Sequence, residues 1–359
     1  MLKLNIAVVF GGASSEHEVS VNSARQVINS LNKEKYNIIP IAITKSGKWL
    51  IGDKGEKYLE IDQCVTDKED GIINEITKKL ITIKPIERDI INFTEWGSEK
   101  IDLVLPIGHG TNMEDGRIQG MLDLLGIHYV FSGHLASALA MNKYKTKLIA
   151  KHSGLDVLDD ILIIKGQKYN EDAIISKLGL PVVVKPNEMG SSVGISIVRT
   201  RKKIIGALEK AFEYGSEVLI EKYLKGRELT VAVIGNNPPK ALPVIEIIPK
   251  ISEFFDYNAK YKKGGSEEIC PADIPKNIER RTKRYSEKIF KAIGCSDLAR
   301  TDFMWDEVSD KIYFLEINTI PGMTATSLAP QAAKAADMNF TAFLDKLIDE
   351  ALKRKNLYS

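Results

Sequence analysis

The chain has few cysteines and no long apolar run. Its 359 residues include three cysteines, Cys64, Cys270 and Cys295, an odd number without the CxxC spacing of zinc sites. This pattern favours reduced thiols over a disulfide framework, and we expect a cytoplasmic protein. No apolar stretch approaches the roughly 20 residues needed to cross a bilayer, and the N-terminus lacks the cleavage site of a signal peptide. The sequence therefore argues against a membrane protein.

An excess of charge of one sign is also lacking. Fifty Lys and Arg residues are balanced by 48 Asp and Glu residues, which leaves a formal net charge of +2. This balance argues against nucleic acid or an anionic membrane as a partner, so any basic site must be local. The motifs GxGxxG and GxxxxGK[ST] are absent, which weakens a nicotinamide dehydrogenase as an interpretation and excludes a Walker loop.

The first part of the chain predicts a parallel α/β unit. Residues 4–10 (LNIAVVF) form a continuous apolar run, followed by a glycine turn and a helix with capping-box spacing at Ser15 and Glu18. Further strands are expected at 36–43 and 101–107. The order strand, turn, helix, strand is Rossmann-like. We treat residues 48–100 as an elaboration of this first domain.

From about Met141 the pattern predicts an α+β arrangement. The short segments PVVVKP, GISIVR, EVLIEKYL, ELTVAVIG and ALPVIEIIP have strand character, with an amphipathic helix at 201–214 between them. LARTDFMW and KIYFLEIN then predict a hairpin. An amphipathic helix, FTAFLDKLIDEALKRK, closes the chain.

The predicted hairpin carries polar side chains on one face. If its strands pair in register, four of them converge: Arg300, Asp302, Glu316 and Asn318. Strict alternation also puts Phe314 on this face and Leu315 on the other. Two acids and an amide without nearby His or Cys suit Mg²⁺. The alternative is an ordinary solvated sheet face, and the pattern alone does not decide between them.

A lysine and a glycine-serine loop predict a phosphate site. In VVVKPNEMGSSVGISIV, Lys185 lies at a strand end before a loop that can offer backbone N–H groups and hydroxyls to phosphate oxygens. The downstream EVLIEKYLKGRE has the composition of an adenine and ribose site. The alternatives are a plain hairpin for the loop and a solvated edge strand for the second segment.

These motifs, in this order, resemble the D-alanine–D-alanine ligases of the ATP-grasp superfamily. The residues that carry the resemblance are FGGASSEHEVS, KPNEMGSSVG, EKYLKGRE, FFDYNAKY, ARTDF and EINTIPGMT. It runs from about Ile6 to Leu347. It implies a fold that is α/β plus α+β: a Rossmann-like N-terminal domain (1–139) followed by a two-domain ATP-grasp fold, with a small central domain (140–220) and a C-terminal domain that carries the metal site (221–359).

The resemblance also implies roles for particular residues. Those expected to hold ATP are Lys143, Lys185, Glu221, Lys222, Leu224, Glu228 and Lys260. Those expected to bind two Mg²⁺ ions, or Mn²⁺, are Asp302, Glu316 and Asn318. Those expected at the amino-acid substrates are Glu16, His109, Ser191, Tyr261, Gly322, Ser327 and Leu328. Those expected to take part in catalysis are Glu16, Ser191, Tyr261, Arg300 and the Gly322 backbone.

The implied activity is ATP-dependent joining of two D-alanines for peptidoglycan synthesis. ATP converts one carboxylate into an acyl phosphate, the second amine attacks it, and ADP and phosphate are released. Alternatives are a ligase that takes D-serine or D-lactate second, and a non-catalytic ATP-binding regulator. A homodimer is implied, with no nucleic-acid or membrane partner. The chain departs from the family pattern at Gly108, where Leu is common, and at Met189, where Glu is common.

Overall fold

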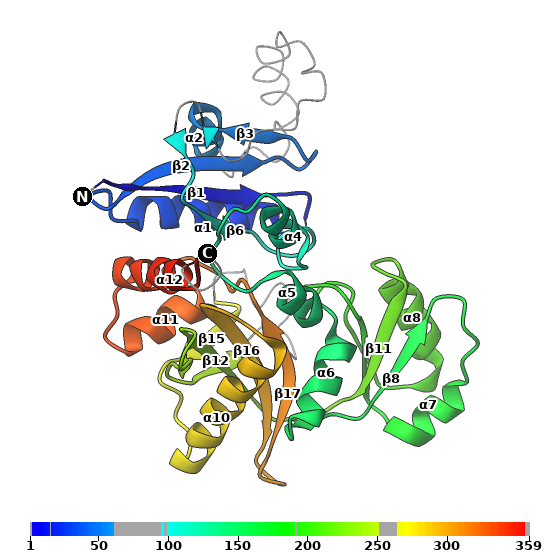
Figure 1. Ribbon diagram of the computed structural model, residues 1–359. Helices are drawn as coiled ribbons and strands as arrows, with labels where there is room; N and C mark the ends of the chain where they lie inside the picture. The colour runs from blue at the N-terminus through cyan, green and yellow to red at the C-terminus, as the bar shows by residue number, and fades with distance from the viewer. Residues whose placement is uncertain are drawn as a thin grey trace.

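A mainly parallel sheet and two mainly antiparallel sheets lie in separate parts of the molecule. The computed structural model describes residues 2–14, 16–60, 95–96, 99–190, 192–250 and 264–355. In Figure 1 the N-terminal sheet lies at the top, a large sheet lies below it, and a smaller sheet with its own helices lies at the right. The chain is thus a mixed α/β protein with several sheets, as expected.

The N-terminal sheet is built around β1 (Leu4–Gly11), with the strand order β3-β2-β1-β6. β1 pairs in parallel with β2 (Tyr36–Ile43) and β6 (Leu103–Ile107), while β3 (Trp49–Ile51) is antiparallel to β2. The predicted strands are confirmed here. The predicted cap Ser15 lies outside the described residues. The accompanying helices and the short pair of strands are α1 (His17–Ser30), α2 (Asp53–Leu59), α4 (Arg117–Leu124), β4 (Glu95–Trp96) and β5 (Glu99–Lys100).

The smaller sheet is antiparallel, in the order β10-β9-β11-β8. Its strands are β8 (Asp160–Ile164), β9 (Val182–Pro186), β10 (Ser196–Val198) and β11 (Glu217–Lys222). Its helices are α7 (Glu171–Leu178), the short η2 (Arg201–Lys203) and α8 (Ile204–Phe212). α8 buries Ile204, Ala207, Leu208 and Ala211 against the sheet, because these positions share one helical face.

The large sheet has the order β15-β14-β12-β16-β17-β7, with β13 beside β12. Its strands are β7 (Asp156–Val157), β12 (Arg227–Ile234), β13 (Lys240–Ala241), β14 (Ile245–Pro249), β15 (Ser266–Ile269), β16 (Leu298–Asp306) and β17 (Lys311–Asn318). Only β7 pairs in parallel among the described strands of this sheet. Its surrounding helices are α5 (His134–Met141), α6 (Lys143–His152), α10 (Lys276–Ile293), α11 (Leu328–Ala335) and α12 (Phe340–Lys355).

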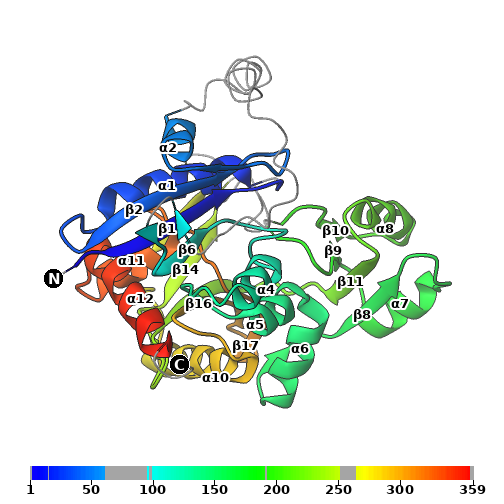
Figure 2. The ribbon, with the colours of Figure 1, turned by 45° about the horizontal axis from the view of Figure 1, so that its top comes forward.

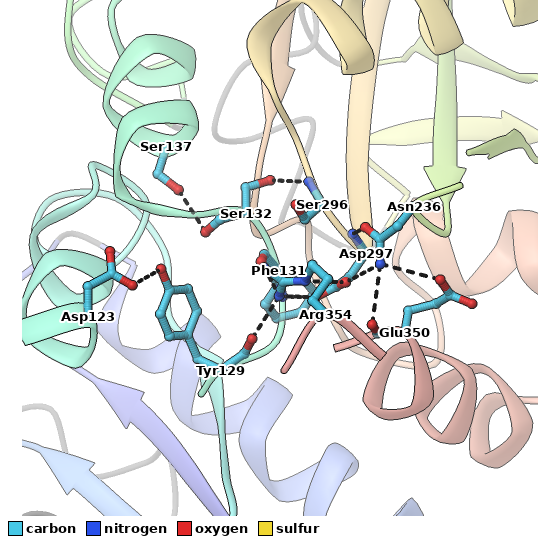
Figure 3. A network of polar contacts seen from close by, with 10 residues as sticks. All are labelled: Asp123, Tyr129, Phe131, Ser132, Ser137, Asn236, Ser296, Asp297, Glu350 and Arg354. Carbon is cyan, nitrogen blue, oxygen red and sulfur yellow. Dashed lines mark hydrogen bonds and ion pairs between the residues drawn. The ribbon is translucent and has the colours of Figure 1, made fainter. Parts of the chain in front are cut away.

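The C-terminal helix α12 joins the N-terminal sheet to the large sheet. One core cluster contains Ile6 and Val8 of β1 together with Phe343 and Leu347 of α12, and in Figure 2 α12 lies beside the N-terminal sheet. Figure 3 shows the polar side of this junction, around the buried Asp297 just before β16. The two sheets therefore share one core.

Polar contacts also stabilise the junction between the N-terminal sheet and the large sheet. Asp297 accepts a hydrogen bond from the Phe131 backbone N–H at 2.8 Å and pairs with Arg354 at 2.6 Å. Arg354 also donates to the backbone oxygens of Tyr129 and Phe131. A buried carboxylate is stable only when its oxygens are paired in this way. The network fixes the start of β16 against the N-terminal part of the chain.

A β-bulge corrects the predicted alternation of β17. Asp302 lies opposite Glu316, but the next residue, Phe303, lies opposite Phe314, so Leu315 is the extra residue. Phe314 is therefore buried in the core, 6.1 Å from the ring of Phe303 in an edge-on arrangement. The prediction that Phe314 shares the polar face and Leu315 the apolar one is wrong, because a bulge shifts the two-residue period.

Candidate functional site

Two cavities of the described chain meet at Glu316. The first, here called the α1 cavity, has a volume of about 440 Å³ and lies between α1, the loop after β6 and the ends of β16 and β17. The second, called the intersheet cavity, has a volume of about 770 Å³ and lies between the smaller and the large sheet. Glu316 lines both cavities. Its carboxylate can therefore act on molecules bound on either side.

The predicted register of the β16–β17 hairpin is confirmed. Arg300 lies opposite Asn318, and Asp302 lies opposite Glu316. Arg300 makes two parallel hydrogen bonds to Asp302, from Nε to Oδ1 at 2.9 Å and from Nη2 to Oδ2 at 2.8 Å. The Thr230 hydroxyl donates a further hydrogen bond to Asp302 Oδ1 at 2.5 Å. The sheet thus gathers the four predicted polar side chains on one face.

The guanidinium of Arg300 is a fixed positive charge at this hairpin. Burial opposes its charged form, but the carboxylates of Asp302 and Glu316 outweigh burial and raise the pKa of Arg300 above its ordinary value. Its bidentate contact also holds the planar group in one orientation. A rigid, permanently charged donor can stabilise negative charge that develops on a reacting oxygen.

The hairpin also supplies oxygen ligands for a hard cation. Asp302 and Glu316 are opposed carboxylates, and the Asn318 amide lies two residues further along β17. Within the described residues, no three His, Cys, Asp or Glu side chains gather into a metal-binding cluster. A divalent ion would therefore need the Asn318 oxygen and oxygens of a bound phosphate besides the two carboxylates. This all-oxygen donor set fits Mg²⁺.

The α1 cavity places acidic side chains around a histidine. Glu16 and His109 are buried and both line it. His109 Nδ1 lies 3.9 Å from Glu114 Oε1. Burial lowers the pKa of His109, but the nearby carboxylates of Glu114 and Glu16 outweigh burial, so the pKa is raised. The carboxylates make this wall suited to an ammonium group.

The far wall of the α1 cavity is the turn between β17 and α11. Gly322, Ser327 and Leu328 line it, as predicted for substrate contacts. A Cβ atom on Gly322 would lie 2.8 Å from Ser327 Oγ, so a larger residue at this position would require Ser327 to shift. Ser327 Oγ also contacts Thr324 Oγ1 at 2.7 Å. The turn is held rigid by its own side chains.

The intersheet cavity brings the predicted ATP residues together. Of the residues predicted to hold ATP, those that line it are Lys143, Lys185, Glu221, Lys222, Leu224 and Glu228. Lys143 lies at the start of α6, where its Nζ donates to the Met189 backbone oxygen at 2.5 Å and lies 3.9 Å from Glu316 Oε2. Lys185 Nζ pairs with Glu221 Oε2 at 2.5 Å. The ammonium group of Lys143 thus lies next to Glu316, whereas that of Lys185 is paired with Glu221.

Three predicted residues lie outside the described part of the chain. They are Ser191, Lys260 and Tyr261. Their roles stay predictions.

The departures at Gly108 and Met189 have local explanations. A Cβ atom at Gly108 would meet the Met113 side chain at 2.3 Å, because buried Met113 fills the space that a larger residue 108 would need. At Met189 the backbone oxygen makes the contact to Lys143, so this bond does not depend on the side chain.

The sequence analysis missed Lys147 and Glu114. Lys147 is buried and bonds Glu221 Oε1 at 2.6 Å, and it lies four residues after Lys143 on the same helix. That i, i+4 spacing was the signal available in MNKYKTK. Glu114, in GHGTNMEDG, lines the α1 cavity and accepts a hydrogen bond from the Gly110 backbone N–H at 2.7 Å. Glu114 follows a glycine-rich turn and has no comparable helical spacing to another functional residue, so the sequence offered no signal for it.

Two family descriptions match the chain. "D-ala D-ala ligase N-terminus" matches residues 5–132, and "D-ala D-ala ligase C-terminus" matches residues 149–349. Together they contain the described lining residues of both cavities except Lys143. The chain therefore belongs to the D-alanine–D-alanine ligase family, which confirms the predicted family and the prediction of a ligase.

Individual relatives agree with this assignment. The D-alanine–D-alanine ligase of Chloroherpeton thalassium is 40% identical over 366 residues, which cover 99% of this chain and 98% of that protein. The Bacillus anthracis D-alanine–D-alanine ligase, solved as a complex with ATP, has 32% identity and a TM-score of 0.73 and covers 99% and 100% of the two chains. The VanG D-Ala:D-Ser ligase of Enterococcus faecalis has 34% identity and a TM-score of 0.80, with 98% and 100% covered.

No helix in the described ranges is long and apolar enough to span a membrane.

Proposed function

We propose that this chain joins two D-alanines into D-alanyl-D-alanine, with ATP as the source of energy and ADP and phosphate as the other products. The observation that carries the proposal is Glu316, which lines both a cavity that suits amino acids and one that suits a nucleotide. A ligase of this kind has to bring a carboxylate and a terminal phosphate together. Family membership supports the same reaction.

The fold supports this proposal as three parts that enclose the substrates. We propose a Rossmann-like domain at 1–139, followed by an ATP-grasp pair at 140–220 and 221–359. The parallel sheet around β1 supports the first, and the two antiparallel sheets on either side of the intersheet cavity support the second. In this arrangement ATP binds between the two antiparallel sheets.

The nucleotide would bind in the intersheet cavity. Lys143 and Lys185 would contact its phosphates, and Leu224 with neighbouring apolar side chains would pack against the base; these residues all line the cavity. Lys222, Glu221 and Glu228 offer groups for the base edge and the ribose. Asp302, Glu316 and Asn318 would hold two Mg²⁺ ions. When bound, the ions offset the charge of the transferred phosphoryl group.

The amino acids would bind in the α1 cavity. Glu16 would take the ammonium group of the first D-alanine, with His109 beside it. Ser327 and Leu328 would receive the second. Arg300 and the Gly322 backbone N–H would stabilise the oxyanion that forms when the second amine attacks the acyl phosphate, and both residues line this cavity. The predicted site also includes Ser191, Lys260 and Tyr261, and we expect the last two to help exclude water from the acyl phosphate.

We further propose a cytoplasmic homodimer without nucleic-acid or membrane partners. The near-zero net charge and the ligase family support these proposals. Gel filtration with light scattering checks the dimer. A monomer at assay concentration contradicts it.

One experiment tests the activity. The protein is incubated with ATP, Mg²⁺ and single or paired D-amino acids, and phosphate release and product mass are measured. We expect D-alanine-dependent phosphate release with formation of the dipeptide. Preferred incorporation of D-serine or D-lactate from equal mixtures would favour those alternatives, and ATP binding without turnover would favour a non-catalytic regulator.

A further inference from the structure

A closed cluster of ion pairs lies behind one wall of the intersheet cavity. Its members are Lys147 of α6, Asp160 of β8, Lys185 of β9 and Glu221 of β11. Two lysines and two carboxylates make the cluster formally neutral. Its strands are neighbours, since Glu221 lies opposite Asp160 across the β11–β8 pair and opposite Val183 across the β11–β9 pair.

Lys147 is fully satisfied within this cluster. Its Nζ lies 2.6 Å from Asp160 Oδ2, 2.6 Å from Glu221 Oε1 and 2.9 Å from the Leu158 backbone oxygen. These three acceptors match the three protons of an ammonium group. The side chain is only 3% exposed, and Lys147 is not among the described residues that line the cavity. It therefore cannot serve as a direct nucleotide ligand in this arrangement.

Glu221 is shared between two lysines. One of its oxygens faces Lys147, and the other faces Lys185 at 2.5 Å. Lys185 borders the cavity, whereas Lys147 does not. The Glu221 carboxylate is 4% exposed, so removing its last positive partner would leave a buried charge unpaired, which is strongly unfavourable.

We propose that Lys147 is a positioning residue that frees Lys185 for the phosphates of the nucleotide. When phosphate oxygens draw Lys185 away from Glu221, Lys147 remains as the partner of Glu221. Without Lys147, Glu221 would hold Lys185 as its only cation, and nucleotide binding would have to break that pair. This inference rests on the proposed role of Lys185 in binding ATP, and it adds a residue that does not touch the nucleotide.

The test is a double-mutant cycle on ATP affinity. Calorimetric titration with ATP and Mg²⁺, without D-alanine, compares Lys147→Met in the natural chain and in a Glu221→Gln background. We expect the dissociation constant for ATP to rise about tenfold or more in the natural chain. In the Glu221→Gln background the same change should have less than about a twofold effect, because the carboxylate that pairs with Lys185 has been removed.

A matched control and a second variant guard against misfolding. Lys145→Met changes an exposed lysine of the same helix and should leave ATP affinity unchanged. If Lys147→Met does not fold, Lys147→Gln, which keeps a hydrogen-bond donor without the charge, replaces it on the same cycle. Equal losses of affinity in both backgrounds, or no loss in the natural chain, would overturn the proposal.

The test of Lys147 and the test of the proposed ligase activity can fail independently. D-alanine-dependent phosphate release by the natural chain tests the activity, whereas the cycle reads ATP binding alone. A natural chain that ligates D-alanine while Lys147→Met binds ATP normally refutes only the role of Lys147. A chain that binds ATP with the predicted coupling but does not ligate refutes only the reaction.

Discussion

The α1 cavity and the intersheet cavity share one hairpin but offer different surfaces. Near the end of β17, the hairpin presents Arg300 and Asn318 to the α1 cavity. Further along, it presents Met304 and Leu315 to the intersheet cavity. Asp302 and Glu316 lie between these two stretches. A single pair of strands thus changes from charged to apolar along its length, and the two carboxylates that we propose as metal ligands lie where it changes.

The difference matches the chemistry proposed for each side. Small zwitterionic amino acids require fixed charges such as Glu16 and Arg300, because they offer little apolar surface. A nucleotide base requires apolar contact, and its phosphates require cations such as Lys143. Substitutions along the hairpin should therefore have three kinds of effect. Those at the shared carboxylate should affect both substrates, those on the α1 side should affect the rate of the chemical step, and those on the other side should affect only the binding of ATP.

The largest effect is expected at the shared carboxylate. Glu316→Gln should lower kcat by about 10³-fold or more, because several kcal/mol of transition-state stabilisation would be lost with the metal ligand. Steady-state phosphate release measures it, and circular dichroism checks the fold. Asp310→Asn, at the exposed turn of the same hairpin, is the matched control. Activity within a few-fold of the natural chain would refute the metal assignment.

A smaller effect on chemistry is expected at Arg300. Arg300→Lys keeps the charge but loses the bidentate contact to Asp302 and the planar donor set. We expect kcat to fall by about 10²–10³-fold with little change in ATP affinity, as for loss of an oxyanion donor. Separate measurements of kcat and of the ATP dissociation constant distinguish an effect on the chemical step from an effect on ATP binding. A change confined to ATP affinity would place Arg300 on the nucleotide side instead.

The bulge in β17 predicts opposite results at adjacent residues. Phe314→Ala should reduce the free energy of unfolding by about 3–5 kcal/mol, because Phe314 is buried in the core. Leu315→Ala should reduce it by only about 1 kcal/mol but should raise KM for ATP about fivefold, because Leu315 lines the intersheet cavity. Urea unfolding and ATP titrations test both. A large loss of stability in Leu315→Ala together with a raised KM for ATP in Phe314→Ala would contradict the bulge and favour strict alternation along β17.

The smallest effect concerns the pH dependence of His109. Its pKa in the folded chain is raised above the ordinary value of 6.5, so protonated His109 favours the folded state. That contribution is fully present below pH 6.5 and is lost as the pH rises through the raised pKa. The stability difference between the natural chain and His109→Gln should therefore shrink as the pH rises. Thermal unfolding from pH 6 to pH 9 measures it, and a constant difference contradicts it.

Much of the fold could be predicted because the relevant signals are local. The apolar run 4–10 became β1 and the run 36–43 became β2 with the predicted bounds, since buried parallel strands need continuous apolar sequence. The pairing of Arg300 and Asp302 with Asn318 and Glu316 also followed from period and register. These predictions need no knowledge of distant contacts.

Other parts of the site could not be predicted because their cause lies in distant contacts. Leu315 faces the cavity only because β17 has a bulge next to the Asp302–Glu316 pair. Lys147 bonds Glu221 across 74 residues of sequence, and the pKa of His109 is raised by the carboxylate of its neighbour Glu114 together with that of Glu16, which is distant in the sequence. Contacts between residues that are distant in the sequence cannot be predicted from spacing or composition.

The residues alone were thus enough to predict many of the strands, some of the helices and the family, and to propose which side chains bind phosphate, metal and ammonium groups. Only the tertiary structure decided that Glu316 borders two cavities, that Phe314 and Leu315 exchange faces, and that Lys147 shares Glu221 with Lys185. The physical reason is range: periodicity acts over a few residues, whereas burial and ion pairing depend on which distant strands become neighbours.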